Sequence, residues 1–131
     1  MHPFRAAVEA GDHDAIKAML ADDVTFLSPV AFAPYEGREL VAAILRGAFR
    51  VLGGLRYVRE LEGSGGVDHA LMFKATVDGK DVHGCDFLHL NEAGEIAEFC
   101  VMVRPLSGAN AVATEMGKQF ELIKRELGLP G

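Results

Sequence analysis

The spacing of apolar residues divides the chain into a helical first part and a strand-rich second part. Up to residue 52, apolar residues recur every three or four positions, which is the spacing of a helix with one buried face. The exception is the apolar run VTFLSP at 24–29, which predicts a strand stopped by its proline. The pattern therefore predicts three helices, over residues 4–10, 12–20 and 38–52.

Residues that favour helix ends support these boundaries. Gly11 follows the first helix, and Asp12 is a suitable N-cap for the second. The pair Gly53-Gly54 ends the third helix. The segment AFAPYEG at 31–37 is predicted to be a loop.

From residue 55 onward the period changes to two, which is typical of strands. The turns between these segments, SGG, Asp78-Gly79 and NEAG, are short enough for hairpins. We therefore expect an antiparallel meander of four strands, over 55–63, 67–77, 80–90 and 95–105. Ser107 is a plausible cap for a last helix, whose apolar stripe comprises Val112, Met116, Phe120, Ile123 and Leu127.

This order of elements predicts a single α+β domain over residues 1–131. Strands joined by short hairpins pair antiparallel, and helices gathered on one face of such a sheet give an α+β architecture. We expect a curved antiparallel sheet wrapped around the N-terminal helices, a cone-shaped α+β barrel, with an extra C-terminal helix. A sheet that curves around helices leaves a hollow that suits a small ligand.

Composition narrows the range of partners. The formal net charge is -6, and no short stretch gathers Lys and Arg, so neither a nucleic acid nor an anionic membrane surface is an expected partner. No apolar run approaches the roughly 20 residues of a membrane helix, and the first residues lack a signal-peptide layout, which predicts a cytoplasmic protein. Cys85 and Cys100 show no zinc spacing, so we expect no metal site and no cofactor.

The segment CDFLHL at 85–90 carries the main candidate for chemistry, Asp86. Alternation along its strand puts Asp86 on the same face as Leu88 and Leu90, which is the apolar face. Desolvation there raises the pKa of a carboxyl group toward neutrality, where it acts as a general acid or base. The alternative is a structural aspartate bound to a backbone amide or to Ser28.

Other polar residues are weaker candidates for a ligand site. Ser28 precedes the proline that stops the first strand, Tyr35 lies on a loop near the expected pocket mouth, and His69 shares a strand with apolar residues. His69 is either a second polar group of the pocket or a buried structural histidine. Tyr57 alternates with Arg56 and Arg59, so we expect it on the sheet surface.

The motif AGDHDAIKAMLADDVTFLSPV, with ALMFKATVDGK and CDFLHLNEAGEIAEF after it, resembles the nuclear transport factor 2-like superfamily. That group includes ketosteroid isomerases and SnoaL-like polyketide cyclases, and the likeness spans about residues 4 to 105. The resemblance implies a homodimer that associates through the sheet. It does not imply one activity, because this fold hosts enzymes and non-catalytic modules alike.

A residue-by-residue comparison with ketosteroid isomerase shows what this chain lacks. That enzyme uses an Asp base, with a Tyr and a protonated Asp around the substrate oxygen. Asp86 falls on the protonated Asp, whereas the base falls on Ser28 and the Tyr on Phe4. A serine does not shuttle a carbon-bound proton as a carboxylate does, so the resemblance argues against steroid isomerisation by that mechanism.

Two functions follow as hypotheses. One is an isomerase- or cyclase-like enzyme that acts on a small hydrophobic carbonyl compound, with Asp86 as its buried acid. The other is a non-catalytic ligand-binding or dimerisation module of the same fold. In both, the ligand-binding residues are predicted to be Phe4, Leu20, Ser28, Tyr35, Ile44, Leu45, His69, Leu71, Phe73, Leu88, Phe99, Val101 and Val103.

Overall fold

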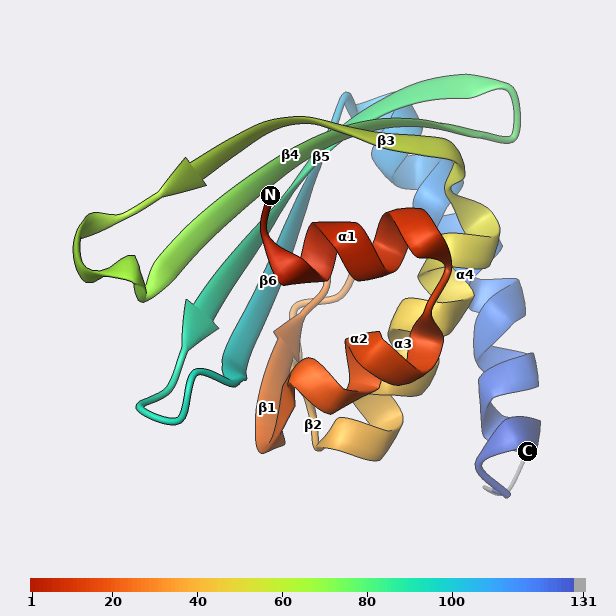
Figure 1. Ribbon diagram of the computed structural model, residues 1–131. Helices are drawn as coiled ribbons and strands as arrows, with labels where there is room; N and C mark the ends of the chain where they lie inside the picture. Colours follow the sequence, from red (N-terminus) through yellow and green to blue (C-terminus); the bar gives the residue numbers. More distant parts are fainter. Residues whose placement is uncertain (129–131) are drawn as a thin grey trace.

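The computed structural model describes residues 1–128 and shows four α-helices and a six-stranded sheet (Figure 1). The helices are α1 (Pro3–Ala10), α2 (His13–Met19), α3 (Arg38–Val51) and α4 (Leu106–Glu126). The strands are β1 (Leu20–Leu27), β2 (Tyr35–Glu36), β3 (Gly53–Glu62), β4 (Asp68–Val77), β5 (Lys80–Leu90) and β6 (Ile96–Arg104). The predicted α+β class and the extra C-terminal helix are confirmed.

Local sequence explains most helix ends. The Asp12 side chain accepts a hydrogen bond from the Ala15 backbone amide, as expected of an N-cap. Gly11 ends α1 in the left-handed conformation, which a residue without Cβ adopts at little cost. The expected cap Ser107 is wrong, because α4 begins at Leu106 with Pro105 as its N-cap.

The sheet is mixed rather than antiparallel throughout, which corrects one expectation. The strand order is β2-β1-β6-β5-β4-β3, and β3 to β6 form the predicted antiparallel meander. The first strand, β1, pairs parallel to β6, with Phe26 opposite Phe99. It also begins at Leu20, inside the range predicted as helix, and part of the predicted loop forms the short edge strand β2.

The curved sheet carries helices on its concave face and leaves its convex face uncovered (Figure 1). Side chains from α1, α2 and α3 meet those of the sheet in one apolar core. Helix α4 packs along α3, where a Cβ on Gly47 would lie 3.2 Å from the Ile123 side chain. Within residues 1–128, no helix is long and apolar enough to cross a membrane.

Candidate functional site

An apolar cavity lies between the concave face of the sheet, α3 and α4. Its volume is about 60 Å³. The polar residues of its described lining are Ser28, Tyr35 and Asp86, and the other lining residues are aliphatic, aromatic, Pro or Met. Such a lining suits a small hydrophobic molecule with few polar groups.

Asp86 lies in the middle of β5, opposite Leu71 on β4 and Val101 on β6. Its side chain faces the core, as the alternation predicted, and the residue is 4 % exposed. The Tyr57 hydroxyl donates a hydrogen bond of 2.8 Å to Asp86 Oδ2. A carboxyl group buried in apolar surroundings is therefore fixed in orientation by one hydroxyl.

Tyr57 is the functional residue that the sequence prediction missed. It was expected on the sheet surface but is 5 % exposed, and its ring packs edge-on against Phe73 at 6.1 Å. The register between β3 and β4 shifts between Tyr57 and Arg59, so the strand carries an irregularity there. With strict alternation, Tyr57 and Arg59 would lie on the same face of the strand. The irregularity places one extra residue between them on β3, so the two side chains lie on opposite faces and Tyr57 points inward.

The pKa of Asp86 is raised to about 7, because burial disfavours the charged carboxylate. The hydrogen bond from Tyr57 opposes this effect by stabilising the ionised form. Burial and the neighbouring Asp86 carboxyl also raise the pKa of the Tyr57 hydroxyl, so this hydroxyl remains a hydrogen-bond donor. Asp86 can therefore take up or release a proton near neutral pH.

The second carboxyl oxygen of Asp86, Oδ1, is the one that Tyr57 does not contact. Among residues 1–128, the Tyr57 hydroxyl is the sole side-chain or backbone hydrogen-bond partner of the Asp86 carboxyl. No fully buried side-chain nitrogen or oxygen in that range lacks a partner. Since Oδ1 has no partner, it retains accessible surface, and Asp86 lines the cavity. The oxygen that Tyr57 leaves free is thus the one that a ligand can reach.

A glycine on the same strand shapes the cavity floor. A Cβ on Gly84 would lie 2.1 Å from Phe73 Cζ, so the phenyl ring occupies the space that any side chain there would need. Phe73 lines the cavity, and its ring also packs against Tyr57. The absence of a side chain at Gly84 thereby keeps the ring beside the Tyr57–Asp86 pair.

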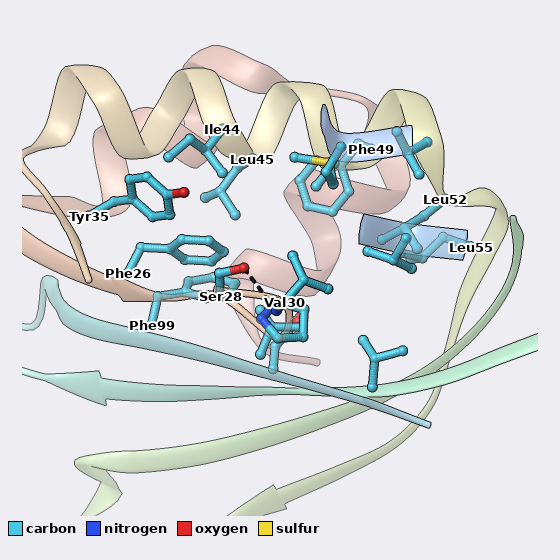
Figure 2. A pocket seen from close by; sticks show the side chains of 18 of the residues that line it. Phe26, Ser28, Val30, Tyr35, Ile44, Leu45, Phe49, Leu52, Leu55 and Phe99 are labelled. Carbon is cyan, nitrogen blue, oxygen red and sulfur yellow. Dashed lines mark hydrogen bonds between the residues drawn. The ribbon is translucent and has the colours of Figure 1, made fainter. Parts of the chain in front are cut away.

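Two hydroxyl groups lie at the end of the cavity formed by β1 and β2 (Figure 2). The Ser28 Oγ accepts a hydrogen bond of 3.1 Å from the Val30 backbone amide. The Tyr35 ring stacks on Phe120 of α4, with ring centroids 5.5 Å apart, and its hydroxyl points toward Leu45 in Figure 2. Within residues 1–128, the Tyr35 hydroxyl makes no hydrogen bond to a protein atom.

Helix α4 covers this end of the cavity, a position that the sequence alone did not determine. Val112, Met116 and Phe120 line the cavity, and Ile123 is buried against α3. The apolar stripe of the C-terminal helix is therefore covered by its own chain.

The structure brings most of the predicted ligand-binding residues to the cavity. Their contact with a ligand remains a prediction, but their side chains line the space: Ser28, Tyr35, Ile44, Leu45, Phe73, Phe99, Val101 and Val103, together with Asp86.

Five predicted residues do not line it, because α1 fills the other end of the hollow. Phe4 is fully buried and packs edge-on against Phe99 at 5.1 Å, so it forms core beyond the cavity. Leu20 pairs with Ile96 at the far end of the sheet, and Leu71 and Leu88 are buried outside the cavity lining. His69 donates from Nε2 to the Gly66 carbonyl at 2.9 Å, which fits the structural alternative.

Within residues 1–128, no group of three or more His, Cys, Asp or Glu side chains is arranged to hold a metal ion. The described site itself contributes one carboxyl group and three hydroxyl groups, those of Tyr57, Ser28 and Tyr35.

Comparisons with known proteins place this geometry in a family. The model of the SnoaL-like domain matches residues 2–99. A solved steroid delta-isomerase from Pseudomonas aeruginosa shares 32 % identity at a TM-score of 0.87, over 90 % of this chain and 86 % of that one. An uncharacterised protein with a cystatin-like fold from Silicibacter pomeroyi shares 35 % identity at a TM-score of 0.88, over 96 % and 88 % of the two chains.

A more distant solved structure shows the same fold. It is a putative polyketide cyclase from Pseudomonas putida, with 19 % identity and a TM-score of 0.64, over 81 % of this chain and 89 % of that one. A comparison with curated proteins found no match. The family match and the similarity to the Pseudomonas aeruginosa structure agree with the resemblance seen in the sequence, and the chain belongs to the SnoaL-like domain family, with the nuclear transport factor 2-like fold.

Proposed function

We propose that the protein is an acid–base enzyme of the isomerase or cyclase type, acting on a small hydrophobic carbonyl compound through Asp86. The observation that carries this proposal is the free Oδ1 of Asp86 in an apolar cavity, on a carboxyl group whose pKa is about 7. A general acid or base works best when its pKa lies near the operating pH. Buried polar atoms with a structural role have hydrogen-bond partners, whereas Oδ1 has none among the protein atoms of residues 1–128.

The lining supports a neutral substrate. None of the described lining residues is Lys, Arg or His, so a carboxylate or phosphate on the ligand would be buried without a counter-charge. Aromatic and aliphatic side chains provide most of the contact surface. A flat or compact apolar carbonyl compound fits these surroundings.

A single proton carrier also restricts the type of reaction. Asp86 is the titratable carboxyl group of the described lining, so the group that removes a proton from the substrate is also the group that returns a proton to it. Reactions of this kind conserve the atoms of the substrate, as in moving a double bond or closing a ring within one molecule. Both need a carbon–hydrogen bond made acidic by an adjacent carbonyl group.

The relatives support this class of reaction without specifying a substrate. The solved relatives include a steroid delta-isomerase and a putative polyketide cyclase. This chain differs from the ketosteroid isomerase pattern at two positions, Ser28 and Phe4, and Phe4 lies outside the cavity. An activated substrate, such as one with a carbon flanked by two carbonyl groups, is the better candidate for a site with one carboxyl group.

The first test measures binding by thermal shift and calorimetry with a panel of neutral ketones and phenols. A ligand that binds the folded state raises its stability with the logarithm of saturation. The variant Asp86→Leu with Tyr57→Phe removes the carboxyl and leaves no buried hydroxyl without a partner. We expect wild type and the exposed-site control Asp81→Asn to bind, and the double variant to lose most of its affinity for phenols, whose hydroxyl group donates to the carboxylate.

The second test separates an enzyme from a binding module. Exchange of the α-protons of 2-tetralone or a cyclic 1,3-diketone in D₂O, followed by NMR, requires proton removal but no knowledge of the natural substrate. We expect wild type to accelerate exchange, and Asp86→Asn to lose about 100-fold or more of that acceleration. Binding without accelerated exchange would contradict the enzyme and favour the non-catalytic ligand-binding module.

We also propose that two copies associate through the convex face of the sheet. Register partners on β4, β5 and β6 form rows across this face, and two central rows are mostly apolar: Met72, Cys85 and Met102, then Ala70, Phe87 and Cys100. Phe87 and Met102 are 40 % and 59 % exposed. An exposed apolar patch of this kind marks an interaction surface.

Charge at the two ends of this face supports a second copy as the partner. At one end Lys74, His83 and Arg104 form a row, and at the other end Asp68, His89 and Glu98 form a row. A two-fold axis that lies in the interface, parallel to these rows, would place the basic row of one copy opposite the acidic row of the other. The face is therefore complementary to itself.

Sedimentation velocity tests this association. We expect a dimer in wild type, dissociation in Met102→Glu, and weaker dimers in Glu98→Lys and in Arg104→Glu. Combining the two charge reversals restores the opposed signs and should restore the dimer. A monomeric wild type, or charge variants that dimerise as well as wild type, would contradict the proposal.

A further inference from the structure

We infer that the hydroxyl groups of Ser28 and Tyr35 bind the carbonyl oxygen of the substrate, while Asp86 at the other side of the cavity moves the proton. This assignment rests on the proposed function and divides the site into a proton-carrying side and an oxygen-binding side. It reverses the roles implied by the resemblance, in which Asp86 would bind the oxygen and the position of Ser28 would move the proton.

The register of three strands places Ser28 level with Asp86. Leu27, the last residue of β1, pairs with Cys100 of β6, so the next residues along these parallel strands are Ser28 and Val101. Val101 in turn pairs with Asp86 on β5. All three residues line the cavity, so Ser28 and Asp86 flank Val101 on one face, two strand spacings or about 10 Å apart.

That separation fits the reacting unit of a ketone. A carbon–hydrogen bond must approach Asp86 Oδ1 to about 3 Å, and the carbonyl oxygen must lie about 2.8 Å from a hydroxyl donor. Because the sheet is concave on this side, the two side chains converge over Val101. A ketone lying across Val101 would then present its α-carbon to Asp86 and its oxygen to Ser28.

Both hydroxyl groups are free to donate. The Ser28 Oγ uses a lone pair to accept from the Val30 amide, which leaves its hydrogen available. Tyr35 pairs with Phe26 on the edge of the sheet, and its hydroxyl has no protein partner in the described residues. A hydroxyl donor suits a carbonyl oxygen, which gains negative charge when the α-proton leaves.

The carboxyl group of Asp86 is less suited to hold that oxygen. When it is ionised it has no proton to donate, and its ionised form is the one that accepts the α-proton. In the step proposed, the C–H bond breaks as the Oδ1–H bond forms, and the electron pair moves through the new C=C bond onto the carbonyl oxygen. Ser28 and Tyr35 stabilise this oxygen, and Asp86 then returns the proton.

The vibration of a bound carbonyl group tests this assignment directly. Hydrogen bonding lowers the C=O stretching frequency, and ¹³C labelling of 2-tetralone isolates that band from the protein. We expect the bound band to lie lower in frequency than in an apolar solvent. Tyr35→Phe and Ser28→Ala should each raise the frequency of this band. Ser28→Thr keeps the hydroxyl group, and Asp86→Asn does not touch the carbonyl oxygen, so both should leave the band in place.

Each outcome is decisive. A frequency that changes in Asp86→Asn but not in the two hydroxyl variants would overturn the inference and leave the proposed function standing. A ligand that binds with no lowering of its carbonyl frequency would overturn it as well. Failure of every ketone to bind wild type would instead contradict the proposed function. In proton exchange, the two hydroxyl variants should lower kcat more than they raise KM, because they act on charge that develops during the reaction.

Discussion

The two faces of β4, β5 and β6 place carboxyl groups in opposite settings. On the convex face, Asp68 and Glu98 are exposed, and Asp68 contacts His89 at 2.6 Å. On the concave face, Asp86 has no cationic partner among residues 1–128 and accepts one hydrogen bond, from Tyr57. Neighbouring strands thus carry solvated acids on one face of the sheet and an isolated acid on the other.

This difference indicates which acid is available for chemistry. Exposed charged groups change the free energy of folding little, because water solvates them in both the folded and unfolded states. Burial of Asp86 shifts its pKa from 3.8 to about 7, which corresponds to about 4 kcal/mol. A domain of this size is stable by roughly 5–15 kcal/mol, so the buried acid is a large expense that a purely structural role does not require.

The largest effect is expected in the pH dependence of stability. The folded protein keeps the Asp86 proton up to about pH 7, whereas the unfolded chain releases it near 3.8, so stability falls as pH rises between these values. The free energy of unfolding of wild type should therefore decrease by about 4 kcal/mol from pH 4 to pH 8, and this decrease should be absent in Asp86→Asn. Urea unfolding of wild type and variant measures it, and Asp81→Asn, on the exposed end of the same strand, should behave as wild type.

A smaller effect is expected at the cavity floor. Gly84→Ala forces the Phe73 ring to move, which should destabilise the fold by about 1–3 kcal/mol and weaken ligand binding. The matched control is Gly117→Ala in α4, where an added Cβ meets no atom within 4 Å. There we expect a gain of up to about 1 kcal/mol from helix propensity. Equal effects of the two substitutions in thermal unfolding would contradict this description of the inner face.

The smallest effect concerns the hydrogen bond to Asp86. Tyr57→Phe removes a donor that favours the ionised carboxylate, so the pKa of Asp86 should rise further. Loss of one hydrogen bond should lower stability by about 1 kcal/mol. Tyr35→Phe removes a hydroxyl that does not contact Asp86 and should leave the pKa of Asp86 in place. A carboxyl titration that moves the same way in both variants would contradict the assigned contact.

The inner face was predictable from sequence where alternation continues without interruption. Asp86 and Gly84 follow strict period two on β5, so the inward direction of Asp86 could be predicted from the sequence. On β3 the register shift next to Tyr57 breaks that period, and nothing in LRYVRELEG marks it. The partner of the key carboxyl group was missed for this reason.

Long-range pairing explains the other differences. The parallel contact of β1 with β6 joins segments far apart in sequence, and no turn residue signals it. Leu20 fits both the helical stripe before it and the strand after it, so the sequence pattern assigned it to the helix. The position of Phe4 against Phe99, which fills one end of the hollow, depends on how α1 docks on the sheet.

The central claim is that Asp86 is a ligand-facing acid with a pKa near neutrality. A ¹³C NMR titration of the aspartate carboxyl carbons, with Asp86 assigned by its absence in Asp86→Asn, measures this most directly. We expect a midpoint of about 7 that moves when a ketone or phenol binds. A midpoint near the ordinary value of about 4, or one unaffected by a bound ligand, would show that Asp86 is a structural residue.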